Sequence, residues 1–66
     1  MTVDDILCDY AGQDVDFALL KISCRLMELD MKDKKDELDM EEMKALTEAS
    51  NKLEIQKASG QHKVSV

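Results

Sequence analysis

The sequence predicts an all-α protein in which two long helices form an antiparallel hairpin, preceded by a short N-terminal helix and completed by oligomerisation. The 66-residue chain has no proline, and it is rich in Leu, Met, Ala, Glu and Lys, which favour helices. Strand-like alternation of apolar and polar residues never lasts more than a few positions. Because a chain of this length has only a small core, we expect a partner or a second copy to complete it.

The first expected helix covers residues 3–10. Thr2 is its expected N-cap, and Asp5 follows three residues later, as in a capping box. A helix this short is unstable in isolation because nucleation is costly, so its apolar side must pack on something. That side consists of Val3, Ile6, Leu7 and Tyr10.

The second expected helix begins after the N-cap Asp14, continues to about Met31, and carries two apolar seams. In the first seam the spacings are 4, 3, 4 and 3, through Val15, Leu19, Ile22, Leu26 and Leu29. In the second they are 3, 4, 3 and 4, through Phe17, Leu20, Cys24, Met27 and Met31. The seams lie roughly 160° apart on the helical wheel, and a helix with two apolar faces is normally sandwiched between neighbours.

The third expected helix runs from Met40 to about Ala58, with Asp39 as N-cap and Glu42 at the third helical position. Residues 32–37 contain no apolar side chain, so they form either the loop between the long helices or extra turns of helix. The third helix has a single apolar stripe, made of Met43, Leu46, Ala49 and Leu53. We expect this stripe to cover the first seam, and the second seam to face a partner or another subunit.

Ile55 points away from the stripe of the third helix and is a further candidate for a contact with another subunit, although a lone exposed Ile is common. The tail after Ala58 is short and polar. We therefore expect a single helical domain over residues 1–58 and disorder over residues 59–66.

Charge and composition exclude several classes of partner. The net charge is −6, so nucleic acids and anionic membranes should repel the chain. No apolar run is long enough to cross a membrane. The first 17 residues hold five Asp and no Lys or Arg, unlike a secretory signal. We expect a cytoplasmic protein in which Cys8 and Cys24 are reduced, small, buried apolar groups.

No motif predicts catalysis, a metal or a cofactor. Cys8, Cys24 and the only histidine, His62, do not have the spacing of a zinc site. Asp30, Asp33 and Asp36 do not fit the ligand pattern of a calcium loop. There is no Gly-rich phosphate loop, and we expect no enzyme activity.

The double seam predicts a small regulatory or assembly protein that binds helices, first of all those of other copies of itself. One alternative is an acidic inhibitor that imitates nucleic-acid charge on a basic partner. Its charges would be Asp4, Asp5, Asp9, Asp14 and Asp16.

A third hypothesis comes from residues 43–57. This stretch resembles the second helix of the oligomerisation hairpin in bacteriophage small terminase subunits. The resemblance implies an oligomerising subunit of a nucleoprotein machine for packaging DNA. It covers less than a quarter of the chain and rests on common helix-forming residues, and the chain has no basic or helix-turn-helix segment to bind DNA.

Overall fold

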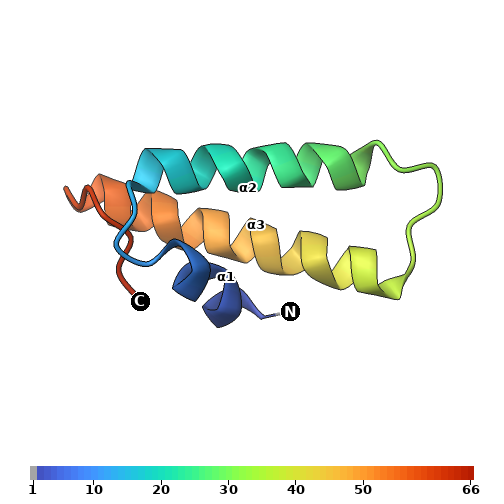
Figure 1. Cartoon of the computed structure of the whole chain (residues 1–66), viewed down its shortest axis with the longest axis horizontal. Coiled ribbons are helices and arrows are strands. Elements are labelled where there is room, and N and C mark those ends of the chain that lie inside the picture. Colours follow the sequence, from blue (N-terminus) through green and yellow to red (C-terminus); the bar gives the residue numbers. More distant parts are fainter. Residues whose placement is uncertain (1) are drawn as a thin grey trace.

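The computed structural model describes residues 2–66 and contains three helices, α1 (Val3–Tyr10), α2 (Val15–Asp30) and α3 (Glu37–Ala58). The two long helices lie side by side and run in opposite directions, joined by a loop at one end of a molecule that measures 38 × 18 × 16 Å (Figure 1). Within the described residues there is no strand, only an isolated bridge between Asp14 and Lys63. The predicted all-α hairpin with a short N-terminal helix is confirmed.

Side-chain caps begin each helix. The Thr2 hydroxyl accepts a hydrogen bond from the backbone N–H of Asp5, whose side chain accepts one from the N–H of Thr2. At the start of α2, the Asp14 carboxylate accepts hydrogen bonds from the N–H groups of Asp16 and Phe17. These caps satisfy N–H groups that have no partner inside the helix.

The third helix starts three residues earlier than expected. Asp36, not Asp39, is the N-cap, and its carboxylate accepts a hydrogen bond from the N–H of Asp39 at 2.8 Å. The prediction of a start at Met40 was wrong, because Asp39 occupies the third position of a capping box and also binds Lys32. Residues 31–36 form a loop, so α2 and α3 are separate helices.

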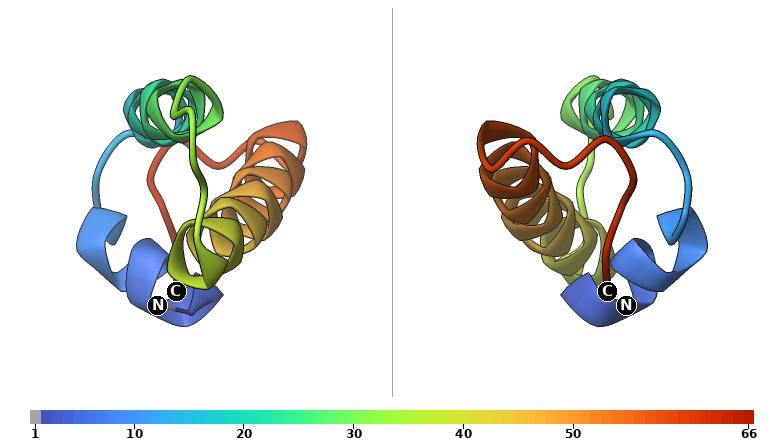
Figure 2. Two further views of the ribbon diagram at one scale, coloured as in Figure 1. Left: turned by 90° about the vertical axis from the view of Figure 1, so that its right-hand side faces the viewer. Right: turned by 90° about the vertical axis from the view of Figure 1, so that its left-hand side faces the viewer.

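The core lies between the three helices and includes one residue of the tail. Figure 2 shows this arrangement end-on, with α2 above and α1 and α3 below it. The small residues Ala18 and Ala49 are fully buried, which suits a close approach of helices. The buried apolar residues are Ile6, Leu7, Val15, Ala18, Ile22, Leu29, Ala45, Leu46, Ala49, Leu53 and Val64.

The C-terminal tail is packed against the rest of the chain, so the expected disorder of residues 59–66 was wrong. Val64 is buried in the core, and its N–H donates to the carbonyl of Gln13 at 2.7 Å. Its carbonyl accepts from the N–H of Gly12 at 3.0 Å. The Gln56 side chain also bonds both backbone groups of Ser65. One apolar side chain and these hydrogen bonds are enough to order a short polar segment.

Candidate interaction surface on helix α2

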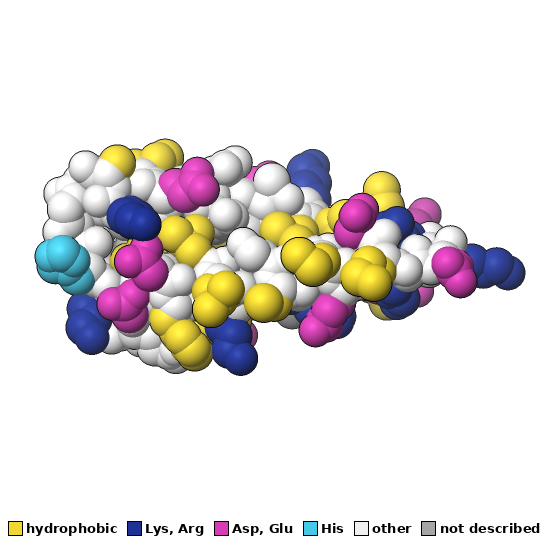
Figure 3. Space-filling view, turned by 90° about the horizontal axis from the view of Figure 1, so that it is seen from above, with side chains coloured by type: hydrophobic (Ala, Val, Ile, Leu, Met, Phe, Trp, Pro, Cys, Tyr) yellow, Lys and Arg dark blue, Asp and Glu magenta, His cyan; other side chains and the backbone are white. Residues whose placement is uncertain are grey.

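The second seam of α2 is exposed along its whole length, and we call its residues Phe17, Leu20, Cys24, Met27 and Met31 the outer seam. The exposed fractions are 44% for Phe17, 61% for Leu20, 64% for Met27 and 77% for Met31. Cys24 is exposed as well. Figure 3, which looks down on α2, shows hydrophobic side chains along the molecule. Scattered apolar side chains are ordinary at protein surfaces, whereas a contiguous row is typical of an interaction site.

Helix α1 does not cover the outer seam. Its residues Ile6 and Leu7 are buried in the core, and Val3 and Tyr10 pack against that core. In the end-on views α1 lies below α2, on the side away from the upper surface of α2 (Figure 2). The chain therefore completes its own small core and still leaves the outer seam uncovered.

The first seam and the stripe of α3 lie in the core. Val15, Ile22 and Leu29 are buried, while Leu19 and Leu26 are partly buried and pack on them. On α3, Leu46, Ala49 and Leu53 are buried and Met43 is partly buried. These nine residues bring the two long helices together.

Ile55 is 67% exposed but lies on α3, two residues after the buried Leu53 and therefore nearly opposite it on that helix. We do not include Ile55 in the outer seam, because the seam belongs to α2. Sequence reasoning missed Ala18, Ala45 and Val64 as core residues. Ala gives a weak apolar signal, and Val64 stands alone in a polar segment.

An ion pair between α2 and α3 flanks the middle of the outer seam. Arg25 binds Glu42 through two nitrogens, Nε to Oε2 at 2.6 Å and Nη2 to Oε1 at 3.1 Å. The hydrogen bond from Arg25 lowers the pKa of Glu42, and the bond from Glu42 raises the pKa of Arg25. Such two-pronged pairs are strong and geometrically specific, so Arg25 holds α3 at a defined position beside α2.

Two more ion pairs tie the ends of the hairpin. At the loop end, Lys32 Nζ lies 2.8 Å from Asp39 Oδ2, and this hydrogen bond lowers the pKa of Asp39. At the other end, Lys57 Nζ lies 2.7 Å from Asp16 Oδ1, which raises the pKa of Lys57. The spacing of charges along the chain did not predict these pairs, because Lys57 and Asp16 lie on different helices and Lys32 reaches Asp39 across the loop that joins α2 to α3.

The acidic residues near the N-terminus are exposed, but several already have partners. Asp5 belongs to the capping box of α1, Asp14 caps α2, and Asp16 pairs with Lys57. Asp4 and Asp9 lie on α1, where Asp4 is in the first turn. Only part of this acidic set is therefore available to a basic partner.

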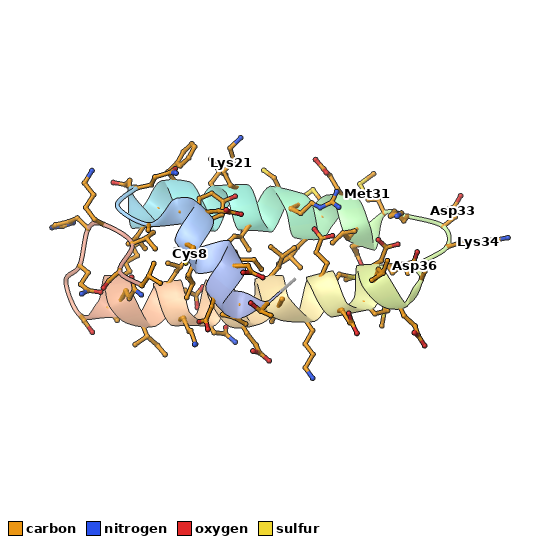
Figure 4. All side chains as sticks on the ribbon, turned by 60° about the horizontal axis from the view of Figure 1, so that its bottom comes forward. Cys8, Lys21, Met31, Asp33, Lys34 and Asp36 are labelled. Atoms are coloured by element: carbon orange, nitrogen blue, oxygen red, sulfur yellow. The ribbon has the colours of Figure 1, made fainter. Side chains whose placement is uncertain are left out.

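Both cysteines are free and exposed, so their predicted burial was wrong. Cys8 lies on α1, as labelled in Figure 4, and Cys24 lies in the outer seam. Each stands on the side of its helix that faces away from the core. Apolar character alone could not show which side of a helix is buried.

The surface includes two hollows. One, of about 300 Å³, lies between the start of α1 and α3. The other, of about 260 Å³, lies where the tail meets α2 and includes His62, Asp14 and Lys57. Over residues 2–66, no three His, Cys, Asp or Glu side chains are grouped as metal ligands would be. No helix in the same range is long and apolar enough to cross a membrane.

The fold and this surface define a small helical hairpin protein with one uncovered apolar helix face. Comparison with protein-family models, with curated proteins and with solved structures found no match to the chain. Its function therefore has to be inferred from its own surface.

Proposed function

We propose that the protein is a non-enzymatic interaction module that binds a helix on the outer seam of α2, either from a second copy of itself or from a partner protein. The supporting observation is the exposure of four large apolar side chains in one row, three on α2 and the fourth, Met31, at its C-cap. A small regulatory or assembly protein would use such a surface to join other chains.

Burial of the outer seam would supply a substantial driving force. Fully burying one large apolar side chain contributes roughly 1.5–3 kcal/mol, and the outer seam offers Phe17, Leu20, Met27 and Met31. Recognition of a helix in this way uses anchors three and four residues apart. Met side chains adapt to irregular partner surfaces, so the Met27 and Met31 end tolerates more than one shape of partner.

The two other hypotheses have less support. An acidic inhibitor would need the charges of the N-terminal region, but Asp5, Asp14 and Asp16 are engaged within the chain. A subunit of a DNA-packaging machine would use residues 43–57, but the apolar side of this stretch packs inside the hairpin. An outer face for assembly is more evident on α2 than on α3.

A reducing compartment such as the cytoplasm suits this surface. Cys24 is an exposed, free thiol in the middle of the outer seam. Thiols remain reduced in the cytoplasm, where Cys24 would act as a small apolar contact.

The two cysteines provide a direct test. Cys8 and Cys24 are both free and exposed, but only Cys24 lies in the outer seam. We would treat cells that contain the protein with N-ethylmaleimide and measure the alkylation rate of each thiol by mass spectrometry. The purified protein at high dilution gives the rate of each thiol when its helix faces water.

Binding at the outer seam predicts that Cys24 reacts several-fold more slowly in cells than in the dilute protein, while Cys8 reacts at the same rate in both. Cys8 is the matched control, because general effects of the cell on thiolate reactivity act on both residues. If Cys24 reacts as fast in cells as in dilution, the proposed binding surface is wrong.

A further inference from the structure

The outer seam has the spacing by which two helices pack on each other. Its intervals of 3, 4, 3 and 4 residues place Phe17, Cys24 and Met31 at one type of coiled-coil position and Leu20 and Met27 at the other. From Phe17 to Met31 the seam is about 21 Å long, at about 1.5 Å per residue. In the end-on views neither α1 nor α3 lies over the upper surface of α2 (Figure 2). A second copy of α2 could pack along this surface with two-fold symmetry.

Two opposite charges beside the outer seam are available for such a contact. Lys21 and Glu28 are seven residues apart, so they lie on the same flank of the seam. Lys21 Nζ lies 5.7 Å from the centre of the Phe17 ring and joins no ion pair within residues 2–66. Glu28 has a single contact, to Arg25 Nη1 at 3.3 Å, and Arg25 is already bound to Glu42.

These charges favour antiparallel packing. When two such helices run in opposite directions, each flank of one helix faces the same flank of the other. Lys21 of each copy then lies beside Glu28 of the other copy, which gives two such pairs related by the two-fold axis. On the other flank Ser23 then lies beside Asp30 of the second copy, without a like-charge contact. Parallel packing would instead bring Lys21 beside Asp16 of the second copy, but Lys57 already binds Asp16 at 2.7 Å.

The register of apolar residues agrees with this pairing. If Leu20 faces Met31 of the second copy, then Cys24 faces Met27, and the same two layers repeat on the other side of the axis, while Phe17 lies beyond these four layers at each end. In this register Lys21 and Glu28 of the second copy are offset by two residues, about 3 Å along the helix. The Lys21 side chain, which is long and projects outward in Figure 4, can span that offset.

We propose that the outer seam binds a second copy of this chain in antiparallel orientation, with Lys21 of each copy paired to Glu28 of the other. This inference rests on the proposed function and adds the identity and orientation of the partner. It makes the protein a symmetric homodimer whose interface is built by α2 and its C-cap residue Met31.

Charge reversal tests the pairing by sedimentation equilibrium. Lys21→Glu alone and Glu28→Lys alone each place like charges together at two sites of the dimer, so each should weaken dimerisation by about tenfold. The double variant, with both changes, restores opposite charges and should regain most of the wild-type affinity. Circular dichroism of each variant checks that the helices are still formed.

A matched control removes the effect of net charge. Glu48→Lys lies on an exposed part of α3 and changes the net charge from −6 to −4, as Glu28→Lys does. It should leave the dimer as strong as the wild type or slightly stronger, because two copies with less negative charge repel each other less. Weakening by Glu28→Lys but not by Glu48→Lys supports the specific pair.

Three results would overturn the inference. A wild-type monomer at every concentration excludes self-association, and protection of Cys24 in cells would then leave the proposed function standing with a different partner. A double variant that stays as weak as the single variants excludes the Lys21–Glu28 pair. Rescue of Lys21→Glu by Asp16→Lys instead of Glu28→Lys would show parallel packing.

Discussion

Ion pairs that join α3 to α2 and to the loop hold the two long helices in position. Arg25 on α2 holds Glu42 on α3 with two hydrogen bonds, and Lys32 in the loop holds Asp39 in the first turn of α3. Each acceptor is mostly covered, with 18% of the Glu42 side chain and 12% of the Asp39 side chain exposed. Because both carboxylates gain a cationic partner on folding, their pKa values are lowered in the folded chain.

These lowered pKa values predict loss of stability in acid. Above the ordinary values, about 4.3 for Glu and 3.9 for Asp, both carboxylates are ionised in the folded and the unfolded chain, and the pairs contribute fully. As the pH falls through those values, the unfolded chain takes up protons before the folded chain does, so the free energy of unfolding decreases. We expect Tm to be level from pH 7 to about 5 and to fall at lower pH.

Paired variants locate the origin of this acid sensitivity. Glu42→Gln with Asp39→Asn should lower Tm at pH 7 and flatten the fall in acid. Glu41→Gln with Asp33→Asn changes two exposed carboxylates that form no ion pair in the described chain, and should keep the wild-type fall. Thermal melts followed by circular dichroism at dilute protein would measure both. An equal slope in the two double variants would contradict the assignment.

At the scale of elements, the C-terminal tail packs across the connection between α1 and α2. Backbone groups of Gly12, Gln13 and Val15 bond the tail, and the Val64 side chain enters the core between the helices. Gly12 has a φ of +78°, in the left-handed region that other residues rarely adopt, so a glycine suits this turn. The tail therefore stabilises the position of α1 although it has no helix of its own.

The two valines of the tail give a matched pair of variants. Val64 is 4% exposed and Val66 is 68% exposed. Val64→Ala should decrease the free energy of unfolding by roughly 1–2 kcal/mol, because about two buried methylene equivalents are lost at about 0.8 kcal/mol each. Val66→Ala should change it by less than about 0.5 kcal/mol. Urea denaturation would measure both, and equal values would show that the tail is not packed in solution.

In the whole molecule, the core of the hairpin is complete without any contribution from the outer seam. Leu53 on α3 is fully buried, whereas Leu20 on α2 is 61% exposed. The three helices and Val64 thus form a complete, small core, and the outer seam adds an apolar surface that the fold itself does not use. This separation of core and surface makes it possible to disturb binding without unfolding the chain.

The same substitution at these two positions tests the separation. Leu53→Ala should cost about 2–5 kcal/mol, which is most of the roughly 3–5 kcal/mol that a single core of this size supplies. Leu20→Ala should change the unfolding free energy of the dilute monomer by less than about 0.5 kcal/mol. Chemical denaturation at low protein concentration would compare them. A large loss from Leu20→Ala would mean that the outer seam supports the fold.

The helices, the caps at Thr2 and Asp14, and the two seams of α2 could be predicted from the sequence, because caps and periodicity depend on residues that are close together in the chain. The predicted start of α3 at Met40 was wrong, because the local signal fits two positions. Asp36 with Asp39 and Asp39 with Glu42 are both acid pairs three residues apart. The contact of Lys32 with Asp39 favours the earlier start.

Three features could not be predicted from local patterns: which seam of α2 lies inside, where α1 packs, and that Val64 enters the core. Both seams have five apolar residues at coiled-coil spacing, so periodicity shows two faces without showing which of them meets α3. That choice depends on how α1 and α3 pack around α2, through contacts between distant parts of the chain. The outer seam could therefore be predicted from the sequence as an apolar stripe. Its exposure could not be predicted, because burial depends on which residues are neighbours in space.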